Sequence, residues 1–354
     1  MAPRSQTQLE VMGTIAHLAT IGDDGTELIE GASAHLRELE ARWSRFKSSS
    51  EINRLNTSAG MPVVVSAPTV ALIELGIEGW RVTNGYFDPT VLGDVVRAGY
   101  DRSFCEITDE TARIATSSFR RGCDGIEVDP GSRTVRLPAG VAVDPGGIGK
   151  GLAADLVIDA LRTAGAEGAL VNVGGDVRVA GASPGAGWVI ELSHAGSSRP
   201  RETVRLVDGA VATSATSYRS WFRSGTRTHH LIDPRTGESV DNDIVSVSVA
   251  AARGWQADVL TKAIFVAGVR AGLEVADALD AAALITTADG IRHANPPWCN
   301  LATPERRLRG SSCGAFGSGV VGPSRDGTAA DPAVARGGDD SGFLAVREAE
   351  EPST

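Results

Sequence analysis

The spacing of hydrophobic and polar positions predicts both strands and helices in the first part of the chain. Residues 8–30 contain EVMGTIAHLAT, a DDG turn signal and TELIE, a pattern that predicts a β-hairpin. Leu36, Leu39 and Trp43 then recur at helical spacing. A helix is therefore predicted from about Ala32 to Trp43.

A second helix has boundary signals at both ends. Ser66 is a favourable N-cap, Pro68 fits a first helical turn, and Asn84-Gly85 can end the helix in a left-handed conformation. After it, the pattern predicts two short strands around the Pro-Gly turn of GIEVDPGSRTVRLP, a buried strand at Val141–Val143, and a helix at Leu152–Leu161 that ends near Gly165.

The second half of the chain is rich in predicted strands. Gly, Pro and Asp signals separate GALVNVGG, DVRVAG, GWVIELS, ETVRLV, GAVATS and THHLID. A longer strand, IVSVSVAAA, precedes a helix from about Gln256 to Val266. A last helix and strand, AGLEVADALD and AAALITT, precede the turn at Asp289-Gly290.

The character of the chain changes at about Thr303. Residues 303–354 are poor in periodic apolar positions and rich in small residues, which predicts a disordered tail that is dispensable for chemistry. The preceding part, 8–302, is predicted to be globular. Its mixture of helices and strands indicates an α+β fold, with mixed sheets flanked by helices in one domain of two joined lobes.

Composition and charge exclude several classes of partner. The 354 residues are 42% hydrophobic and carry a net charge of -10, with basic residues scattered along the chain. This balance argues against nucleic acid or an anionic membrane as the partner. We find neither a signal-peptide core nor a run of 18 apolar residues, so a cytoplasmic location without membrane insertion is the expectation.

The four cysteines are far apart in the sequence. Cys105, Cys123, Cys299 and Cys313 show no metal-type pairing. We therefore expect neither a zinc site nor a disulfide framework, and predict that the four are reduced packing residues.

The segment VDPGGIGKG, from Val143 to Gly151, resembles a phosphate-binding loop only at first sight. A P-loop would need Gly in place of Asp144 and Ser or Thr in place of Gly151. The dinucleotide-binding fingerprint fails as well, because the glycines of this segment alternate. The Asp144 carboxylate would repel a phosphate unless a metal or a nucleobase lies between them.

Other polar clusters fall between apolar segments, where a rigid scaffold often displays binding groups. Each also has an ordinary structural interpretation. The Asp-Pro and Gly-Gly-Asp pairs are common turn residues, and His229 and His230 alternate across a strand, so that one can be core and the other exposed. The clusters are SRFKSSSEINRLN, NGYFDPTV, NVGGD, ATSATSYRSW, HHLIDPRTG and WQADVLTKAIFVAG.

Taken together and in this order, the clusters resemble the FAD:protein FMN transferase family, the ApbE-type flavin transferases. The resemblance covers about Val11 to Pro297. VDPGGIGKG is similar to the family's Asp and Lys-Gly loop, and ALVNVGGDVRVAG to its Asn-x-Gly-Gly-Asp turn. HHLIDPRTG resembles its His-x-x-Asp-Pro-x-x-Gly segment, and QADVLTKAIFVAG its Ala-Asp helix.

This resemblance implies an ApbE-like fold and an activity. The implied reaction transfers the FMN half of FAD to a Thr or Ser hydroxyl of an acceptor flavoprotein through a phosphoester bond, with Mg²⁺ as cofactor and AMP as product. Positioning and neutralisation of charge carry most of the catalysis in such a reaction. The partners implied are therefore FAD as substrate and an acceptor protein, and not nucleic acid.

The resemblance also assigns residues. Asp258 matches the main metal ligand and an aid to the attacking hydroxyl, and the Gly147 carbonyl a second ligand, with oxygen donors of the kind Mg²⁺ prefers. His230 is implied to support the site together with Asp233. The positions that match flavin contacts are Met12, Phe46, Tyr86, Phe87, Asp88, Asp144, Lys150, Thr213 and Ser214.

The chain departs from the family's pattern at two places. The family has Thr four residues after the metal-binding Asp, whereas this chain has Lys262 there and Thr261 one position early. Two alternatives follow: the ammonium substitutes for part of the metal's charge, or Thr261 becomes a ligand after a small shift of the helix. The second departure is ATSATSYR, which is one residue longer than the family's Thr-Ser-Gly-x-Tyr-Arg.

Three other functions are compatible with the same residues. An FAD pyrophosphatase would use water and yield FMN and AMP. A second alternative transfers the flavin to a small-molecule hydroxyl. The third is a non-catalytic flavin-binding protein, which Lys262 favours if it abolishes metal binding.

Overall fold

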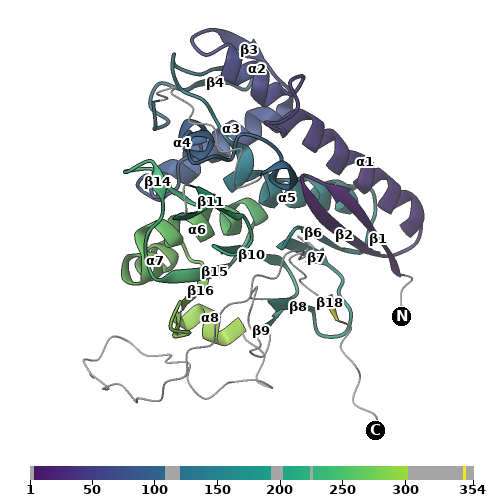
Figure 1. Ribbon diagram of the computed structural model, residues 1–354. Helices are drawn as coiled ribbons and strands as arrows, with labels where there is room; N and C mark the ends of the chain where they lie inside the picture. Colours follow the sequence, from purple (N-terminus) through teal and green to yellow (C-terminus); the bar gives the residue numbers. More distant parts are fainter. Residues whose placement is uncertain (1–3, 108–119, 193–201, 224–225, 302–345, 348–354) are drawn as a thin grey trace, which may run out of the picture.

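The centre of the protein is an eight-stranded sheet. The computed structural model describes residues 4–107, 120–192, 202–223, 226–301 and 346–347 (Figure 1). The sheet has the order β1-β2-β6-β7-β10-β15-β16-β17, and every neighbouring pair is antiparallel. Its strands are β1 (Arg4–Val11), β2 (Thr14–Ile21), β6 (Gly168–Val173), β7 (Asp176–Gly181), β10 (Gly209–Ala215), β15 (Ile244–Ala251), β16 (Ala282–Thr287) and β17 (Arg292–Ala294).

Helices cover one face of this sheet. α1 (Gly25–Trp43) packs on β1 and β2, and α5 (Gly149–Thr163) packs on β6 and β7. α6 (Gly254–Ala267) lies on β10 and β15, and α7 (Val269–Ala278) contacts β16. Figure 1 shows α1, α5 and α6 in one layer above the strands.

The opposite face is covered by a smaller, three-stranded sheet. It consists of β8 (Trp188–Leu192), β9 (Glu202–Leu206) and β18 (Val346–Arg347), and α8 (Pro296–Leu301) packs beside it. Leu170 of β6 packs in the core on this side, whereas its neighbour Val171 packs in the core under the helices. Because successive side chains of a strand point to opposite faces, β6 is buried on both sides.

The remaining elements form a second lobe and the rim of the molecule. The side chains of Ile73 and Val135 from this lobe share one core with Leu36 of α1 and Val157 of α5. The elements are α2 (Glu51–Thr57), α3 (Ala67–Val82), α4 (Leu92–Arg97), the sheet β3-β5-β4 (Pro62–Val64, Thr134–Arg136, Glu127–Asp129), the pairs β11-β12 (Ser220–Arg223, Thr226–His229) and β13-β14 (Ile232–Asp233, Glu238–Ser239), and the 3-10 helices Phe104–Glu106 and Pro145–Gly147. The predicted α+β fold of sheets flanked by helices is confirmed, but the described strands pair antiparallel throughout, so these sheets are not mixed.

The first hairpin was predicted with the wrong turn and the wrong second strand. Its turn is Met12-Gly13, where both residues have positive φ, and TELIE belongs to α1 instead of a strand. Met-Gly is not a common turn pair, so the signal was missed. Leu28 and Ile29 are buried on the same helix as Leu36, which shows that the helical spacing extends through TELIE.

Two other predictions about strands need correction. Val141–Val143 is buried but is not a strand; Val141 forms one isolated bridge with Arg120, and the Asn56 amide binds both backbone groups of Val143. THHLID is divided between β12 and β13, because the chain turns at His230. The helix bounded by Ser66 and Asn84-Gly85 is confirmed.

The prediction for the cysteines is wrong at one position. Cys105 and Cys123 are free, whereas Cys299 on α8 is disulfide-bonded. Separation in the sequence does not determine how closely two thiols approach in the folded chain, and this is why the pattern was misleading.

None of the described helices is long and apolar enough to cross a membrane. The cytoplasmic location stays a prediction. The predicted tail, 303–354, lies outside the described residues except for Val346–Arg347, which pair with Ile190 and Val189 of β8.

We predict that the junction of α5 and α6 tolerates no side chain at Gly151. A Cβ there would overlap the Gly254 carbonyl and lie 2.8 Å from the Asp258 Cβ. Gly151→Ala should therefore destabilise the protein by about 2–4 kcal/mol, because close-packed backbone cannot move aside. Urea unfolding checks this.

The matched control is Gly31→Ala in the exposed part of α1, where nothing lies within 4 Å of the added Cβ. That change should stabilise the protein by about 0.5–1 kcal/mol, since Ala is the better helix former. Equal effects of the two substitutions would contradict the close contact.

A second prediction concerns truncation after Ala302. The cut removes the two-residue pairing of β18 and, with Cys313, the one cysteine of the sequence that is left to pair with Cys299. Both chains are therefore compared in reducing buffer, where the melting temperature of the cut chain should fall by no more than about 4 °C. As a comparison, Trp298→Ala empties a fully buried position on α8 and should cost about 3–5 kcal/mol. A truncated chain as unstable as the Trp298 variant would show that the tail is part of the core.

Candidate functional site

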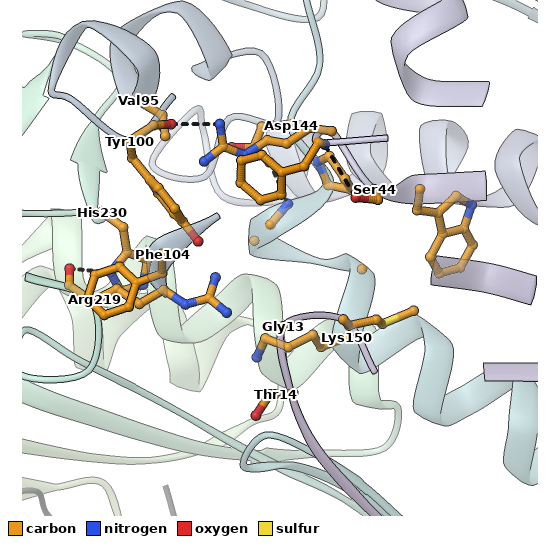
Figure 2. A pocket seen from close by; sticks show the side chains of 18 of the residues that line it. Gly13, Thr14, Ser44, Val95, Tyr100, Phe104, Asp144, Lys150, Arg219 and His230 are labelled. Atoms are coloured by element: carbon orange, nitrogen blue, oxygen red, sulfur yellow. Dashed lines mark hydrogen bonds and ion pairs between the residues drawn. The ribbon is translucent and has the colours of Figure 1, made fainter. Parts of the chain in front are cut away.

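A cavity of about 880 Å³ opens where the second lobe meets the β1-β2 turn and the loop before α5. Figure 2 shows Tyr100, Arg219 and His230 on one side of it, with Asp144 and Ser44 facing them. Nine of the predicted site residues line this cavity: Met12, Phe46, Tyr86, Phe87, Asp88, Asp144, Gly147, Lys150 and His230. Distant parts of the sequence therefore meet at this cavity.

The other predicted residues lie beside this cavity. Thr213 and Ser214 line a smaller cavity of about 80 Å³ that shares Lys150, His230 and other residues with the large one. Asp258 and Thr261 are fully buried and line neither cavity. Lys262, which follows them, lines both.

The loop before α5 is held in place by its backbone. Asn56 binds both backbone groups of Val143, and the amide of Asp144 donates to the Pro89 carbonyl at 2.7 Å. The Asp144 carboxylate accepts a hydrogen bond from the Gly146 amide, which starts the following 3-10 turn. Only glycine fits at position 147, because a Cβ would lie 2.9 Å from the Phe87 ring.

Two lysine-carboxylate pairs lie at the floor of the cavity. Lys150, in the first turn of α5, contacts Asp176 at the start of β7. Lys262 contacts Asp258 one turn earlier on α6, and the second oxygen of Asp258 accepts from the Gly151 amide at 3.2 Å. Both carboxylates are almost completely buried, whereas both ammonium groups are partly exposed.

The charges of this cluster depend on one another. Burial disfavours the Asp258 carboxylate, but the Lys262 and Lys150 ammonium groups outweigh it, so that the pKa of Asp258 is lowered. Burial also disfavours the Lys150 ammonium, yet Asp176 and Asp258 raise its pKa. Burial and the nearby Asp258 raise the pKa of Asp176, whose Oδ1 atom has no hydrogen-bond partner.

One wall of the cavity is aromatic and holds a stacked guanidinium. The Arg45 guanidinium lies 4.3 Å from the ring centroids of both Phe46 and Tyr100. It donates to the Tyr100 carbonyl at 2.7 Å and lies 3.7 Å from the Asp144 carboxylate. Rigid apolar rings beside fixed polar groups are the usual composition of a site for a flat, heterocyclic ligand.

The Tyr86-Phe87-Asp88 turn offers the cavity its two aromatic rings, whereas its carboxylate is engaged by the protein. Asp88 is buried and accepts hydrogen bonds from the Thr90 amide and hydroxyl and from the Gly122 amide. Its pKa is raised, because burial outweighs these hydrogen bonds. We interpret Asp88 as the residue that holds the turn and thereby places Phe87 against Gly147.

His230 is an uncharged polar group of both cavities. Its Nδ1 atom lies 3.3 Å from the Arg219 carbonyl. Burial, followed by the charges of Arg219 and Lys262, lowers its pKa well below the ordinary value. At neutral pH the imidazole is therefore neutral and can position a ligand without adding charge.

The chain matches the model of the ApbE family over residues 12–285. It belongs to the ApbE family. The matched range includes every residue of the cavity floor described above. The match runs from the β1-β2 turn into β16 and includes α1 to α7.

Curated relatives of this ApbE protein are named FAD:protein FMN transferase. The protein from Vibrio cholerae is 31% identical over 270 residues, which covers 73% of this chain and 79% of the relative. The protein from Treponema pallidum is 33% identical over 251 residues, covering 66% and 69%.

Solved ApbE structures have the same fold. The crystal structure of the ApbE protein from Thermotoga maritima is 24% identical and has a TM-score of 0.76, with 85% of this chain and all of that chain covered. The flavin transferase ApbE from Vibrio cholerae is 26% identical with a TM-score of 0.70, and covers 84% and 100%.

Two of the three positions predicted to bind Mg²⁺, Asp258 and Thr261, do not fit a divalent cation as they stand. The Asp258 carboxylate is engaged by Lys262 and the Gly151 amide. The Thr261 hydroxyl donates to the Asp258 carbonyl at 2.7 Å and is hydrogen-bonded to Ser214. The described residues contain no group of three or more His, Cys, Asp or Glu that could hold a metal ion. The arrangement suits an ammonium better than a metal that prefers several oxygen ligands.

Some residues of this ApbE site were not predicted from the sequence. Arg45, Tyr100 and Arg219 all line the large cavity. Arg45 and Arg219 lie within polar clusters noted in the sequence, but nothing distinguishes them from solvated arginines there. Asp176 is the last residue of the Asn-x-Gly-Gly-Asp turn. That motif was recognised in the sequence, and it is the signal from which Asp176 could have been predicted as a site residue.

We predict that His230 makes the stability of the protein depend on pH. Below the ordinary His pKa of about 6.5 the unfolded chain binds a proton that folded His230 does not, so the free energy of unfolding falls as the pH falls. His230→Gln removes this contribution. Urea unfolding at about pH 7.5 and about pH 5.5 should show a smaller loss for the variant. Identical losses in both proteins would be contrary to a neutral, buried His230.

Proposed function

We propose that this ApbE protein transfers the FMN half of FAD to a Thr or Ser hydroxyl of an acceptor protein and releases AMP. One observation carries the proposal: a single large cavity combines an aromatic wall with a floor of ammonium groups, in a chain that the ApbE family model matches over residues 12–285. The relatives named FAD:protein FMN transferase support the assignment of the substrate.

The two ends of the cavity fit the two chemical parts of the substrate. The isoalloxazine ring is flat and largely apolar, so we place it against Met12, Phe46, Tyr86, Phe87 and Tyr100. The pyrophosphate is anionic, so we place it over Lys150, Lys262 and Arg219. A cavity of this volume is at the upper end of the usual range for ligand sites, which runs to about 1,000 Å³.

The reaction is a displacement at phosphorus. The acceptor oxygen forms a bond to the FMN phosphorus, and the bond from that phosphorus to the bridging oxygen breaks. AMP leaves with the bridging oxygen, and the proton of the hydroxyl is released to water. Residues that neutralise the pyrophosphate and hold it in line with the hydroxyl supply most of the rate enhancement. Asp258 and His230 position this site.

Asp258 contributes by fixing an ammonium. Its buried carboxylate holds the Lys262 side chain at the floor of the cavity and ties it to the Gly151 amide at the start of α5. His230 contributes a neutral ring at the boundary of the two cavities. Thr213 and Ser214 line the smaller cavity, where the acceptor hydroxyl can approach.

The deciding experiment is mass spectrometry of candidate acceptor flavoproteins incubated with this protein and FAD. We expect a covalent adduct of one FMN group on a Thr or Ser, together with AMP in equal amount. The acceptor with that Thr or Ser replaced by Ala is the control and should stay unmodified.

Other outcomes identify the alternative functions. FMN and AMP formed without any adduct would identify an FAD pyrophosphatase. AMP formed together with a flavin adduct on a small alcohol would identify a small-molecule acceptor. FAD bound with no product would identify a flavin-binding protein, and NADH bound as tightly as FAD would exclude the flavin site itself.

A further inference from the structure

The use of lysine in this chain is confined to one place. The sequence contains 34 basic residues but only three lysines, Lys47, Lys150 and Lys262. All three line the large cavity, whereas the arginines are spread over the whole chain. A lysine carries a compact, strongly hydrated point charge, in contrast to the broad guanidinium of arginine. In its size and charge, the lysine ammonium therefore resembles a small inorganic cation more closely than the guanidinium of arginine does.

Lys262 lies between the buried Asp258 carboxylate and the cavity. Its ammonium contacts the fully buried carboxylate while 16% of its side chain is exposed. Its Cγ atom is 3.9 Å from the place of a Cβ on Gly147, so it also adjoins the loop before α5. One side chain thus touches two of the three positions that the family resemblance assigns to the metal.

The cluster has the right net charge for an anion only when Arg219 is included. Lys150 and Lys262 are balanced by Asp176 and Asp258. Arg219 lines both cavities and has no carboxylate partner among the described residues. The five groups therefore carry one net positive charge, which faces the cavity and not the protein interior.

We propose that the Lys262 ammonium, supported by Lys150, takes the place of the divalent cation, so that this protein binds the pyrophosphate of FAD without a metal. The proposal rests on the proposed function, because it assumes that FAD is the ligand. A divalent cation placed beside a fixed ammonium would be repelled in this partly buried space. Both oxygens of the Asp258 carboxylate already have partners, one in the Lys262 ammonium and the other in the Gly151 amide.

The test compares Lys262→Thr with the wild-type protein. The wild type should bind FAD equally well in EDTA and in MgCl₂. The variant loses the ammonium and gains a hydroxyl one turn beyond Asp258, so its FAD affinity should fall by about tenfold in EDTA and recover in MgCl₂. Quenching of flavin fluorescence gives both affinities. Circular dichroism shows that each variant is folded.

Two controls separate the charge from the fold. Lys47→Thr removes a lysine from the exposed rim of the same cavity, where it pairs with Glu40; because no buried carboxylate is left there, FAD binding should gain no dependence on Mg²⁺. Riboflavin has no phosphate, so its affinity should be the same in the Lys262 variant and the wild type.

A direct measurement of the metal completes the test. In the presence of FAD, the electron paramagnetic resonance signal of free Mn²⁺ should persist with the wild type and disappear with Lys262→Thr, because bound Mn²⁺ loses that signal. Tightening of wild-type FAD binding by Mg²⁺, or unchanged FAD affinity of the Lys262 variant in EDTA, would overturn the proposal. Failure of the assumption that FAD is the ligand is distinguishable, since the wild type would then bind no FAD under any condition. Failure of the transfer to a protein is distinguishable as well, because it would show only in the mass spectrometry of the acceptors and would leave these affinities unchanged.

Discussion

The contact between the backbones of α5 and α6 determines the rest of the site. Gly151 and Gly254 have no side chains, so the two helices meet at a distance that excludes even a Cβ. At this distance the Gly151 amide reaches the Asp258 carboxylate at 3.2 Å, and the first turn of α5 brings Lys150 next to the same cluster. A second carboxylate, Asp155, accepts hydrogen bonds from the amides of Gly254 and Trp255 and holds the start of α6. Charged groups can be buried here because each one has a partner.

Much of the fold could be predicted, because the pattern of apolar residues follows the layers directly. The helix that ends at Asn84-Gly85 and the strands β6 to β10 were recognisable from caps, turns and alternation. The first hairpin was not, since its turn uses Met12, whose positive φ no local signal indicates. The segment at Val143 was mistaken for a strand because it is apolar and buried. A buried apolar segment need not pair with a neighbouring strand: here the side chain of Asn56 binds the backbone groups of Val143 instead.

The candidate site could be predicted only as far as its motifs. The polar clusters contain many of the residues that line the large cavity. They do not indicate which side chains contact one another or at what distance. Asp258 was interpreted as a metal ligand from the family resemblance. The spacing of four residues places Lys262 on the same face of the helix, but only the structure shows that its ammonium is in contact with the Asp258 carboxylate. Asp88 was expected to contact the flavin, whereas its carboxylate is occupied by Thr90 and Gly122. Hydrogen bonding in the folded chain decides these roles.

A lysine and a metal ion differ in how they constrain catalysis at a pyrophosphate. The ammonium is covalently attached, so the site is complete without capturing an ion, and no ordering of a free cation opposes ligand binding. It carries only one charge, however, and a single ammonium neutralises less of the developing negative charge than Mg²⁺ does. Lys150 and Arg219 line the same space and can offset this difference. A divalent ion would concentrate two positive charges at one point. Here the positive charge is distributed over three side chains around the cavity, which are held in place by buried carboxylates and by the fold, and this arrangement can serve the same anionic ligand.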